Sequence, residues 1–571
     1  DLLTFSAGIP RLESFRGSLG TSAEALKNCL DATTESERLS ERLGYYAHLR
    51  LSEDGGNNTA QDRFARYMSV ASKMEAAASY QRSEIMAIPK ERMDAFLAED
   101  ILSEYIIPLR KIIRFRPHIL SEKEEHLLAL QSEANQTAQK TYSALTDVDL
   151  DFGTLKTKEG EKPLSQASFA SFMLHPDRAL RQEAYTQFYT AFEKHKNTLS
   201  SLLAGSVHLD IYHARARNYP SARAAALFPD KVPEGVYDNL ISAVHDRLEA
   251  VHGYYRLRKE LLHLDTLRHY DVYVPLVKDV QVKHTWDEAV ETILEALQPL
   301  GSEYTDTLSR GLRGRWADRY ENKGKRSGAF SAGSYDGDPY ILINYKEDVL
   351  RDVFTLAHEG GHSMHSWYSV RYNPFQYYQY SIFEAEVAST FNEQLLAAHL
   401  LKKADSPSLK AYIIGKQVDD IIATLIRQTM FAEFEKKIHE TTEQGGALTV
   451  EFLRKTYRSL LETYFGPAMV FEDLSDLEAL RIPHFYRAFY VYKYATGLSA
   501  AVTLADEVLQ GSKAERDRYL SFLSSGGSHY PLEALRKAGV DMERPEPIYK
   551  TLDRFADMVK NLEGLLKVTE E

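Results

Sequence analysis

Helical periodicity runs through most of this chain and constrains its fold more than any other feature. Apolar residues recur at intervals of three and four, with charged residues between them, in six long stretches: 91–107, 121–146, 180–216, 235–263, 408–443 and 449–465. Strand signals are few. A turn signal at 158–161 separates two short extended pieces, and 340–345 is an apolar run of strand length. The sequence therefore predicts a mainly α-helical protein with a small β-sheet.

The length and composition of the chain limit its organisation and its partners. A chain of 571 residues is too long for one compact core, and Gly and Pro interrupt the helical pattern near 153–166. We therefore expect an N-terminal helical domain, 1–160, and a second domain, 161–571. The formal net charge of -13 argues against a nucleic-acid-binding surface, because phosphate contacts need clustered cations. With no apolar run of bilayer length, no signal-peptide pattern and a single cysteine, Cys29, we expect a cytoplasmic protein without a membrane partner.

A His-Glu-Gly-Gly-His sequence at 358–362 is the strongest chemical signal in the chain. Apolar residues around it recur at helical spacing, so a buried helix is predicted there. His358 and His362 are four residues apart, which puts both imidazoles on one face, one turn apart. Two nitrogens in this arrangement can reach one Zn²⁺ ion at about 2.0–2.1 Å, and the adjacent Glu359 is suited to hold and deprotonate a water molecule on the metal. The alternative is a pair of hydrogen-bonded histidines on an ordinary helix.

Two adjacent glycines, Gly360 and Gly361, argue against that alternative. Inside a helix each glycine costs about 1 kcal/mol relative to alanine, so another element is expected to need the space that they leave. We expect that element to pack closely against the helix. A metal site is therefore the preferred interpretation of the motif.

The next predicted helix supplies candidates for the third protein ligand that a catalytic zinc ion needs. Ser381 and Glu384 form a capping box that would start this helix, which gives Glu384 another role. Glu386 and Glu393 are seven residues apart and share a face. If Glu386 binds zinc, Glu393 can accept a hydrogen bond from a ligand imidazole, with a solvated or capping carboxylate as the alternative. His365 is a weaker candidate, which could support a ligand or contact the substrate. A buried, hydrogen-bonded histidine is an equal alternative.

Taken together, these residues resemble a known family. The sequence His-Glu-x-Gly-His-Ser-Met-His is followed, 24 residues after His362, by Glu386 within Ala-Glu-Val-Ala-Ser-Thr-Phe-Asn-Glu. This pattern is similar to that of the thimet oligopeptidase-type zinc metallopeptidases and, among them, of oligoendopeptidase F. One position departs from it, because Gly360 replaces a bulky apolar residue. The resemblance implies a two-lobed helical metallopeptidase with a small catalytic sheet, a deep substrate cleft and one catalytic Zn²⁺ ion. Further family-like motifs lie at 116–121, 271–273, 325–330, 340–345, 530–532 and 538–542.

A Tyr-rich segment, 483–497, holds a second group of candidates. An amphipathic helix that buries aromatic rings would explain its composition. The family resemblance instead implies that His484, Tyr490 and Tyr492 donate hydrogen bonds to the oxyanion that forms on the substrate carbonyl. Tyr486 is a weaker candidate. Because neighbouring tyrosines on a helix cannot all point at one atom, at most two are expected to do so.

These features predict a zinc-dependent endopeptidase that hydrolyses internal bonds of peptides. The strand at 340–345 is expected to lie at the edge of the cleft, where an extended peptide can pair with it through main-chain hydrogen bonds. The resemblance implies that the substrates are short, unstructured oligopeptides. A zinc exopeptidase of carboxypeptidase or dipeptidyl type is one alternative, and a catalytically silent helical binding scaffold is the other. The protein is expected to be a monomer or a small homo-oligomer.

Overall fold

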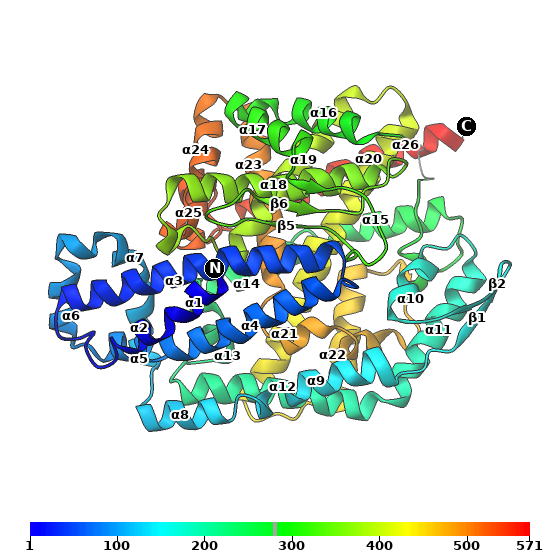
Figure 1. The fold of residues 1–571 in the computed structure, drawn as a ribbon. Helices are drawn as coiled ribbons and strands as arrows, with labels where there is room; N and C mark the ends of the chain where they lie inside the picture. Colours follow the sequence, from blue (N-terminus) through cyan, green and yellow to red (C-terminus); the bar gives the residue numbers. More distant parts are fainter. Residues whose placement is uncertain (278–282, 571) are drawn as a thin grey trace. The chain divides into compact units, whose positions relative to one another are not determined.

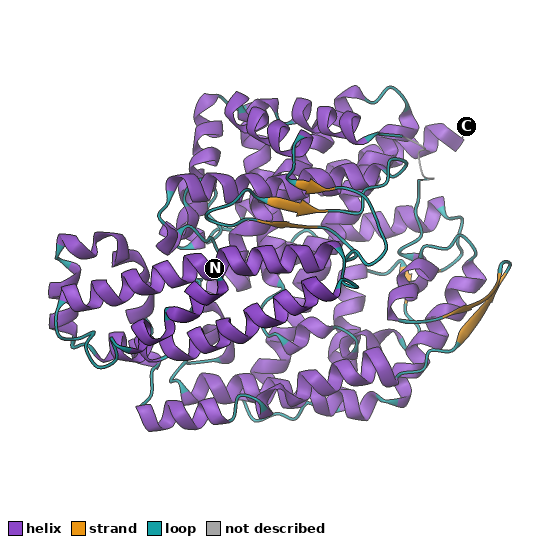
Figure 2. Cartoon of the chain, viewed as in Figure 1, coloured by secondary structure: helices purple, strands orange, loops and turns teal. Residues whose placement is uncertain are grey.

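The computed structural model describes residues 1–277 and 283–570, and it is mainly helical, as predicted. Helices account for 71% of the chain (Figure 2). The chain divides into two compact units, each built from three segments. The predicted boundary near residue 160 lies inside the second unit, because both units are assembled from segments that are distant in sequence. Unit 1 contains Asp1–Glu122, Gln281–Lys402 and Ala501–Val540, and unit 2 contains Lys123–Val280, Lys403–Ala500 and Asp541–Glu571.

The first segment of unit 1 is a bundle of helices (Figure 1). Its helices are α1 (Leu2–Ala7), α2 (Ile9–Glu13), α3 (Ala23–Glu53), α4 (Asn58–Ala78), α5 (Tyr80–Ala87), α6 (Lys90–Leu97) and α7 (Ile106–Ile113). Helix α3 starts at Ser22, whose side chain accepts a hydrogen bond from the N–H of Ala25. Fully buried Leu26, Cys29 and Met93 belong to one core of this bundle.

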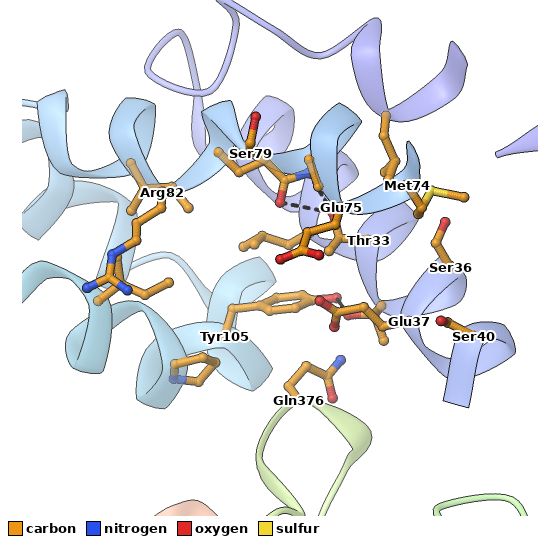
Figure 3. A pocket seen from close by; sticks show the side chains of 18 of the residues that line it. Thr33, Ser36, Glu37, Ser40, Met74, Glu75, Ser79, Arg82, Tyr105 and Gln376 are labelled. Atoms are coloured by element: carbon orange, nitrogen blue, oxygen red, sulfur yellow. Dashed lines mark hydrogen bonds between the residues drawn. The ribbon is translucent and has the colours of Figure 1, made fainter. Parts of the chain in front are cut away.

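The N-terminal helices leave a hollow between them. A cavity of about 610 Å³ is lined by residues of α1, α3, α4, α5 and α7. Glu37 and Glu75 lie around the ring of Tyr105 in its wall, and Arg82 lies at one side (Figure 3). Burial raises the pKa of Glu37. The wall is therefore a mixture of apolar and charged side chains.

The second segment of unit 1 carries the three-stranded sheet, in the order β4-β6-β5. Strand β6 pairs parallel with β4 and antiparallel with β5, with Ser331 opposite Ile341. The predicted strand is present at Tyr340–Leu342, but it is the middle strand of this sheet, so the expected pairing of a peptide with it is wrong. Strand β6 follows β5 in the sequence but lies between β4 and β5 in the sheet. Strand β5 is therefore an edge strand. The elements are α16 (Trp286–Ala296), α17 (Ser302–Arg313), β4 (Ala317–Asp318), β5 (Phe330–Ala332), β6 (Tyr340–Leu342), α18 (Leu350–Tyr372) and α19 (Ile382–Lys403).

The last segment of unit 1 adds α24 (Lys513–Leu523) and α25 (Pro531–Ala538), and α23 (Tyr492–Gln510) precedes them. Unit 2 is also mainly helical. Its helices are α8 (Glu122–Leu130), α9 (Thr137–Ala144), α10 (Gln166–Met173), α11 (Arg178–Lys194), α12 (Lys196–Ala216), α13 (Ala222–Leu227), α14 (Glu234–His245), α15 (Leu248–Leu261), α20 (Pro407–Ile421), α21 (Arg427–Glu443), α22 (Val450–Phe465) and α26 (Glu546–Glu570). Its strands are β1 (Thr154–Thr157), β2 (Gly160–Pro163), β3 (Leu267–Arg268) and β7 (Met469–Val470).

All six stretches of predicted helix are helical in the structure, but most hold two helices. The stretch 408–443 contains α20 and α21, joined by a π turn at Ile422–Ile426, and 235–263 contains α14 and α15. A continuous apolar pattern cannot show such breaks, because the pattern resumes on the next helix. The turn signal at 158–161 forms the antiparallel hairpin of β1 and β2, as predicted. Among the described residues, no helix is both long enough and apolar enough to cross a membrane.

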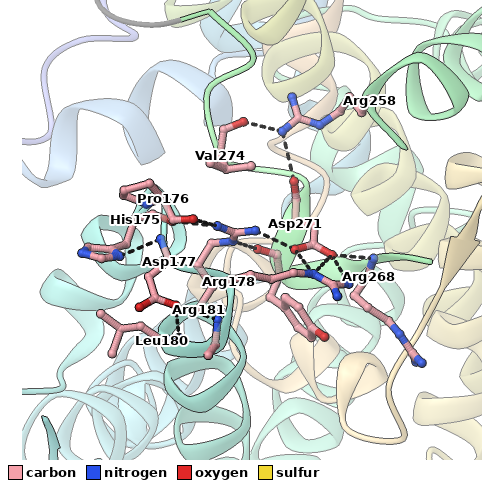
Figure 4. Close-up of polar contacts among 12 residues, drawn as sticks. His175, Pro176, Asp177, Arg178, Leu180, Arg181, Arg258, Arg268, Asp271 and Val274 are labelled. Carbon is pink, nitrogen blue, oxygen red and sulfur yellow. Dashed lines mark hydrogen bonds and ion pairs between the residues drawn. The ribbon is translucent and has the colours of Figure 1, made fainter. Parts of the chain in front are cut away.

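A buried ionic network holds part of unit 2 together around Asp271, the first residue of the family-like motif at 271–273. The fully buried carboxylate of Asp271 accepts hydrogen bonds from Arg178 and Arg181 of α11, at 2.9 and 2.8 Å, and from the backbone N–H of Arg268 (Figure 4). Arg258 of α15 donates to the carbonyl of Asp271 at 3.0 Å. Such a network specifies one packing arrangement, since breaking it would leave buried charges unpaired.

Candidate active site

Helix α18 positions the His-Glu-Gly-Gly-His motif in the middle of its 23 residues. The rings of His358 and His362 lie on one face, with centroids 4.8 Å apart. Burial, and then the charge of His358, lower the pKa of His362 to about 3. The imidazole of His362 is therefore neutral at neutral pH and offers a lone pair, as a metal ligand must.

Helix α19 brings the third candidate ligand to the same place. The N–H of Ser381 donates to the carboxylate of Glu384 at 3.1 Å, so the predicted cap is present and Glu384 serves the start of the helix. One turn into α19, the Oε2 atom of Glu386 lies 3.6 Å from Nε2 of His358 and 3.9 Å from Nε2 of His362. The structure therefore brings together the three residues that the sequence singled out.

The geometry of these three side chains fits a metal ion. In the described part of the chain they form a group of potential ligands whose donor atoms all lie within 4.8 Å of one another. A tetrahedral site with ligands at about 2.1 Å has edges of about 3.4 Å, close to the separations of Glu386 from the two histidines. Two imidazole nitrogens and one carboxylate oxygen, with a fourth position open, are typical of catalytic zinc.

Glu359 lies next to the first ligand and is almost fully buried, at 6% exposure. Burial raises the pKa of its carboxyl group to about 7, although a hydrogen bond from the backbone of Ser331 opposes this. Its Oε2 atom has no hydrogen-bond partner among the described residues. A buried carboxylate oxygen without a partner, beside a cluster of metal ligands, is available to hold a water molecule or a proton. Ser331 belongs to the edge strand β5, so the carboxylate also adjoins a strand that a peptide can extend.

Glu393 supports the first ligand from α19. Its Oε1 atom lies 2.6 Å from Nδ1 of His358, which leaves Nε2 of that ring free for the metal. Burial lowers the pKa of His358, but the hydrogen bond and charge of Glu393, together with the other carboxylates, raise it overall. The structure thus contains the contact that the sequence suggested for Glu393.

His365 lies away from these contacts. It is fully buried and stacks on Tyr380, with ring centroids 3.5 Å apart and planes 7° apart. Neither ring nitrogen has a hydrogen-bond partner among the described residues, and burial lowers the pKa of the ring to about 3. The ring is thus buried, as one of the two alternatives predicted, but it has no hydrogen bond to a described residue. A role for His365 beside a ligand or the substrate stays a prediction.

The two glycines of the motif have different surroundings. A Cβ atom on Gly361 would lie 2.6 Å from the carbonyl oxygen of Ala388 and 2.7 Å from Cα of Ser389, both on α19. The close packing expected from the sequence is therefore present at Gly361. At Gly360 a Cβ atom would meet only the side chain of Leu308, at 3.4 Å. Gly360 is therefore not required by a close approach of another backbone.

The Tyr-rich segment belongs to unit 2. It is not one helix: a 3-10 turn spans Pro483–Tyr486, and α23 starts only at Tyr492. The rings of His484 and Tyr490 are nearly parallel, with centroids 6.3 Å apart. Tyr494 adjoins both rings, at 6.2 and 5.4 Å. Sequence reasoning missed Tyr494, although its spacing of four residues from Tyr490 was a signal.

The two other tyrosines of this segment pack into the protein. The ring of Tyr486 packs against that of Tyr142, with centroids 4.4 Å apart and planes tilted by 33°, and burial raises its pKa. Tyr492 is fully buried, and its ring lies 5.3 Å from that of Tyr237. His484 is exposed and Tyr486 and Tyr490 are half-buried, so Tyr492 is the least accessible of these four side chains.

Comparison with known proteins decides the family. A model of peptidase family M3 matches residues 171–554, and a model described as oligopeptidase F matches residues 84–152. This chain belongs to peptidase family M3. The matched residues include the whole of α18 and α19, which carry the metal-ligand cluster.

Relatives and solved structures agree with this assignment. The chain is 42% identical to oligopeptidase PepF of Bacillus subtilis, over 98% of this chain and 83% of that protein. It is also 42% identical to an oligoendopeptidase F homolog of Borreliella burgdorferi, over 92% of this chain and 89% of that protein. A putative peptidase from Chlamydophila abortus superposes with a TM-score of 0.92 at 36% identity, covering 99% of this chain and 96% of that one. Oligoendopeptidase-F from Enterococcus faecium superposes with a TM-score of 0.78 at 32% identity, covering 99% and 98%.

The resemblance to oligoendopeptidase F is therefore confirmed, as is the helical peptidase fold. The chain is a metallo-oligopeptidase, an enzyme that hydrolyses peptides. The catalytically silent scaffold is accordingly the wrong alternative.

Proposed function

We propose that this M3 peptidase is a zinc-dependent endopeptidase that hydrolyses internal bonds of short, unstructured oligopeptides. The observation that carries the proposal is the convergence of His358, His362 and Glu386 around one position, with the unpartnered carboxylate oxygen of Glu359 beside it. Zinc is the metal that we propose, since this set of nitrogen and oxygen ligands is typical of it.

His358, His362 and Glu386 would hold the metal through Nε2, Nε2 and a carboxylate oxygen. A zinc ion bound there lowers the pKa of water towards neutrality and polarises the substrate carbonyl. Glu359 accepts the proton of the attacking water on its free oxygen and passes it to the leaving amine. Glu393 keeps the proton of His358 on Nδ1, so that Nε2 remains a ligand.

In unit 2 we propose His484, Tyr490 and Tyr492 as donors to the oxyanion that forms as the carbonyl is attacked. Family membership and the local clustering of His484 with Tyr490 support this role. Tyr494 joins the cluster and is a further candidate. We expect the substrate backbone to pair with the edge strand β5, which would give binding that tolerates many side chains.

The proposal is tested by mass spectrometry of products from a peptide that is acetylated at its N-terminus and amidated at its C-terminus. Cleavage in the interior supports an endopeptidase. Resistance of the blocked peptide, with hydrolysis of its unblocked form from one end, would support the exopeptidase alternative instead. A Glu359→Gln variant serves as the control, because it keeps the ligands and removes the base.

The same assay measures the size limit of the substrate. We expect peptides of a dozen residues to be cut and a stably folded protein to resist.

A reducing compartment such as the cytoplasm is the location that we propose, because the single cysteine permits no internal disulfide. A monomer or a small homo-oligomer is the proposed assembly, and sedimentation of the purified protein tests it.

A further inference from the structure

Phe489 has a backbone conformation that a bulky side chain rarely adopts. Its φ angle is +56°, in the left-handed region, where residues other than glycine are strained. Phe489 immediately precedes Tyr490 and lies five residues after His484. The direction of the chain at Phe489 therefore sets where the side chain of Tyr490 points relative to His484.

A buried carboxyl group holds this backbone in place. Glu435, on α21, is fully buried, and its Oε1 atom accepts a hydrogen bond from the N–H of Phe489 at 3.1 Å. Its Oε2 atom has no partner among the described residues. Burial raises the pKa of Glu435 well above its usual range. Burying a carboxyl group costs free energy, and one hydrogen bond to a backbone N–H offsets only part of that cost. A role in stability alone is therefore a poor explanation for Glu435.

The side chain of Phe489 is fixed as firmly as its backbone. Its ring lies 4.6 Å from that of His439 and 5.7 Å from that of Tyr237. His439 is itself held, with Nδ1 2.8 Å from the carbonyl oxygen of Glu435 and Nε2 3.2 Å from Asp210. The hydroxyl of Tyr237 donates to the carbonyl of Ala432, also on α21, at 2.6 Å. One helix thus fixes both the amide and the ring of Phe489.

From this arrangement we infer that Glu435 is a positioning residue, which holds the Phe489 turn so that His484 and Tyr490 form one donor cluster. The inference rests on the proposed function, because it presumes that these two side chains act on the substrate. The side chain of Glu435 meets this loop through its hydrogen bond to the backbone of Phe489, so we infer that it acts through Phe489 and not on the substrate itself.

The test compares Glu435→Ala with Glu435→Gln in steady-state cleavage of a quenched oligopeptide by the zinc-loaded enzyme. Alanine leaves the buried N–H of Phe489 unpaired, whereas the amide oxygen of glutamine can accept the same hydrogen bond as Oε1 of Glu435. A misplacement of about 1 Å at a catalytic group costs about 100-fold in rate. We therefore expect Glu435→Ala to lower kcat by about 10- to 100-fold with KM within about threefold, and Glu435→Gln to stay within about threefold of wild type.

Two further measurements separate positioning from general stability. Amide hydrogen exchange across 483–494 should be faster in Glu435→Ala and unchanged in Glu435→Gln. In a His484→Ala, Tyr490→Phe background, Glu435→Ala should cost less than about threefold in kcat, because the two donors that the Phe489 turn positions are already gone. Ile438→Val, which shortens a fully buried side chain of the same helix, is the matched control and should leave kcat unchanged.

The outcomes distinguish failure of the inference from failure of the proposed function. If His484→Ala and Tyr490→Phe lower kcat but Glu435→Ala does not, the positioning role is overturned and the donors stand. If those two variants leave kcat within twofold, the donor assignment fails, and the positioning role fails with it. A Glu435→Gln variant as impaired as Glu435→Ala also overturns the inference. Should Glu435→Ala not fold, Glu435→Asp replaces it, since the shorter side chain withdraws the acceptor and should lower kcat in the same way.

Discussion

Gly361 allows the backbone of α19 to lie close to α18. A methyl group added at this position is therefore expected to disturb the proposed metal site. In Gly361→Ala the new Cβ atom would lie 2.6 Å from the carbonyl oxygen of Ala388. An ordinary contact is at least about 3.4 Å, so α19 must retreat by about 0.8 Å. Glu386 lies on the same helix, two residues before Ala388, and it would move with it. Metal–ligand distances tolerate only about 0.2 Å.

We therefore expect Gly361→Ala to weaken zinc binding by about 10- to 100-fold, as other displacements around metal ligands do. That change corresponds to about 1.4–2.8 kcal/mol of binding free energy. The neighbouring Gly360→Ala is the matched control. Its Cβ atom meets only the flexible Leu308 side chain, so the metal affinity should stay within about twofold. The free energy of unfolding should rise by up to about 1 kcal/mol, because alanine favours a helix more than glycine does.

Zinc affinity is measured by competition with a chromophoric chelator, and the stability of each metal-free variant is measured by urea unfolding. The close-approach argument is refuted if Gly361→Ala binds zinc as tightly as the wild type. It is equally refuted if Gly360→Ala loses more affinity than Gly361→Ala, since the two glycines would then not differ as the structure requires.

Four further predictions follow from named groups. Glu359→Gln should lower kcat by at least about 1000-fold while the metal stays bound, and an active variant would remove Glu359 as the base. Glu393→Ala should raise the Kd for zinc by about 10- to 100-fold, and an unchanged Kd would show that its hydrogen bond to His358 is dispensable. A chelator should abolish peptide cleavage and added zinc should restore it; activity in metal-free protein would contradict metal catalysis. Burial lowers the pKa of His269 to about 4. As the pH falls from about 6.5 to 4, this histidine therefore binds a proton in the unfolded state but not in the folded state. The free energy of unfolding then falls by about 3 kcal/mol. His269→Phe should flatten urea stability over that window, and an unchanged slope would contradict the argument.

The metal site could be predicted almost completely from the sequence. His358 and His362 share a helix, so their separation follows from helical geometry alone. The cap formed by Ser381 and Glu384 marks the start of α19. Because Glu384 is used in this cap, Glu386 is the stronger candidate ligand. Local rules fix these relations, and the family resemblance supplied the choice between the remaining carboxylates.

Features that depend on distant neighbours could not be predicted. Helical pattern alone predicts the same role for Gly360 and Gly361, and only the packing of α19 distinguishes them. The strand at 340–345 is predicted to pair with a peptide, but its place in the middle of the sheet depends on pairings that local alternation does not encode. The turn at Phe489 carries no glycine signal, because a buried carboxyl group of another helix stabilises it.

The central claim is that His358, His362 and Glu386 hold one catalytic zinc ion. The most direct test is an X-ray structure of the active enzyme with anomalous data collected on both sides of the zinc absorption edge. We predict one strong peak, present only above the edge, at about 2.0–2.2 Å from Nε2 of His358, Nε2 of His362 and a carboxylate oxygen of Glu386. An active crystal with no such peak, or with the peak bound by other residues, would contradict the claim.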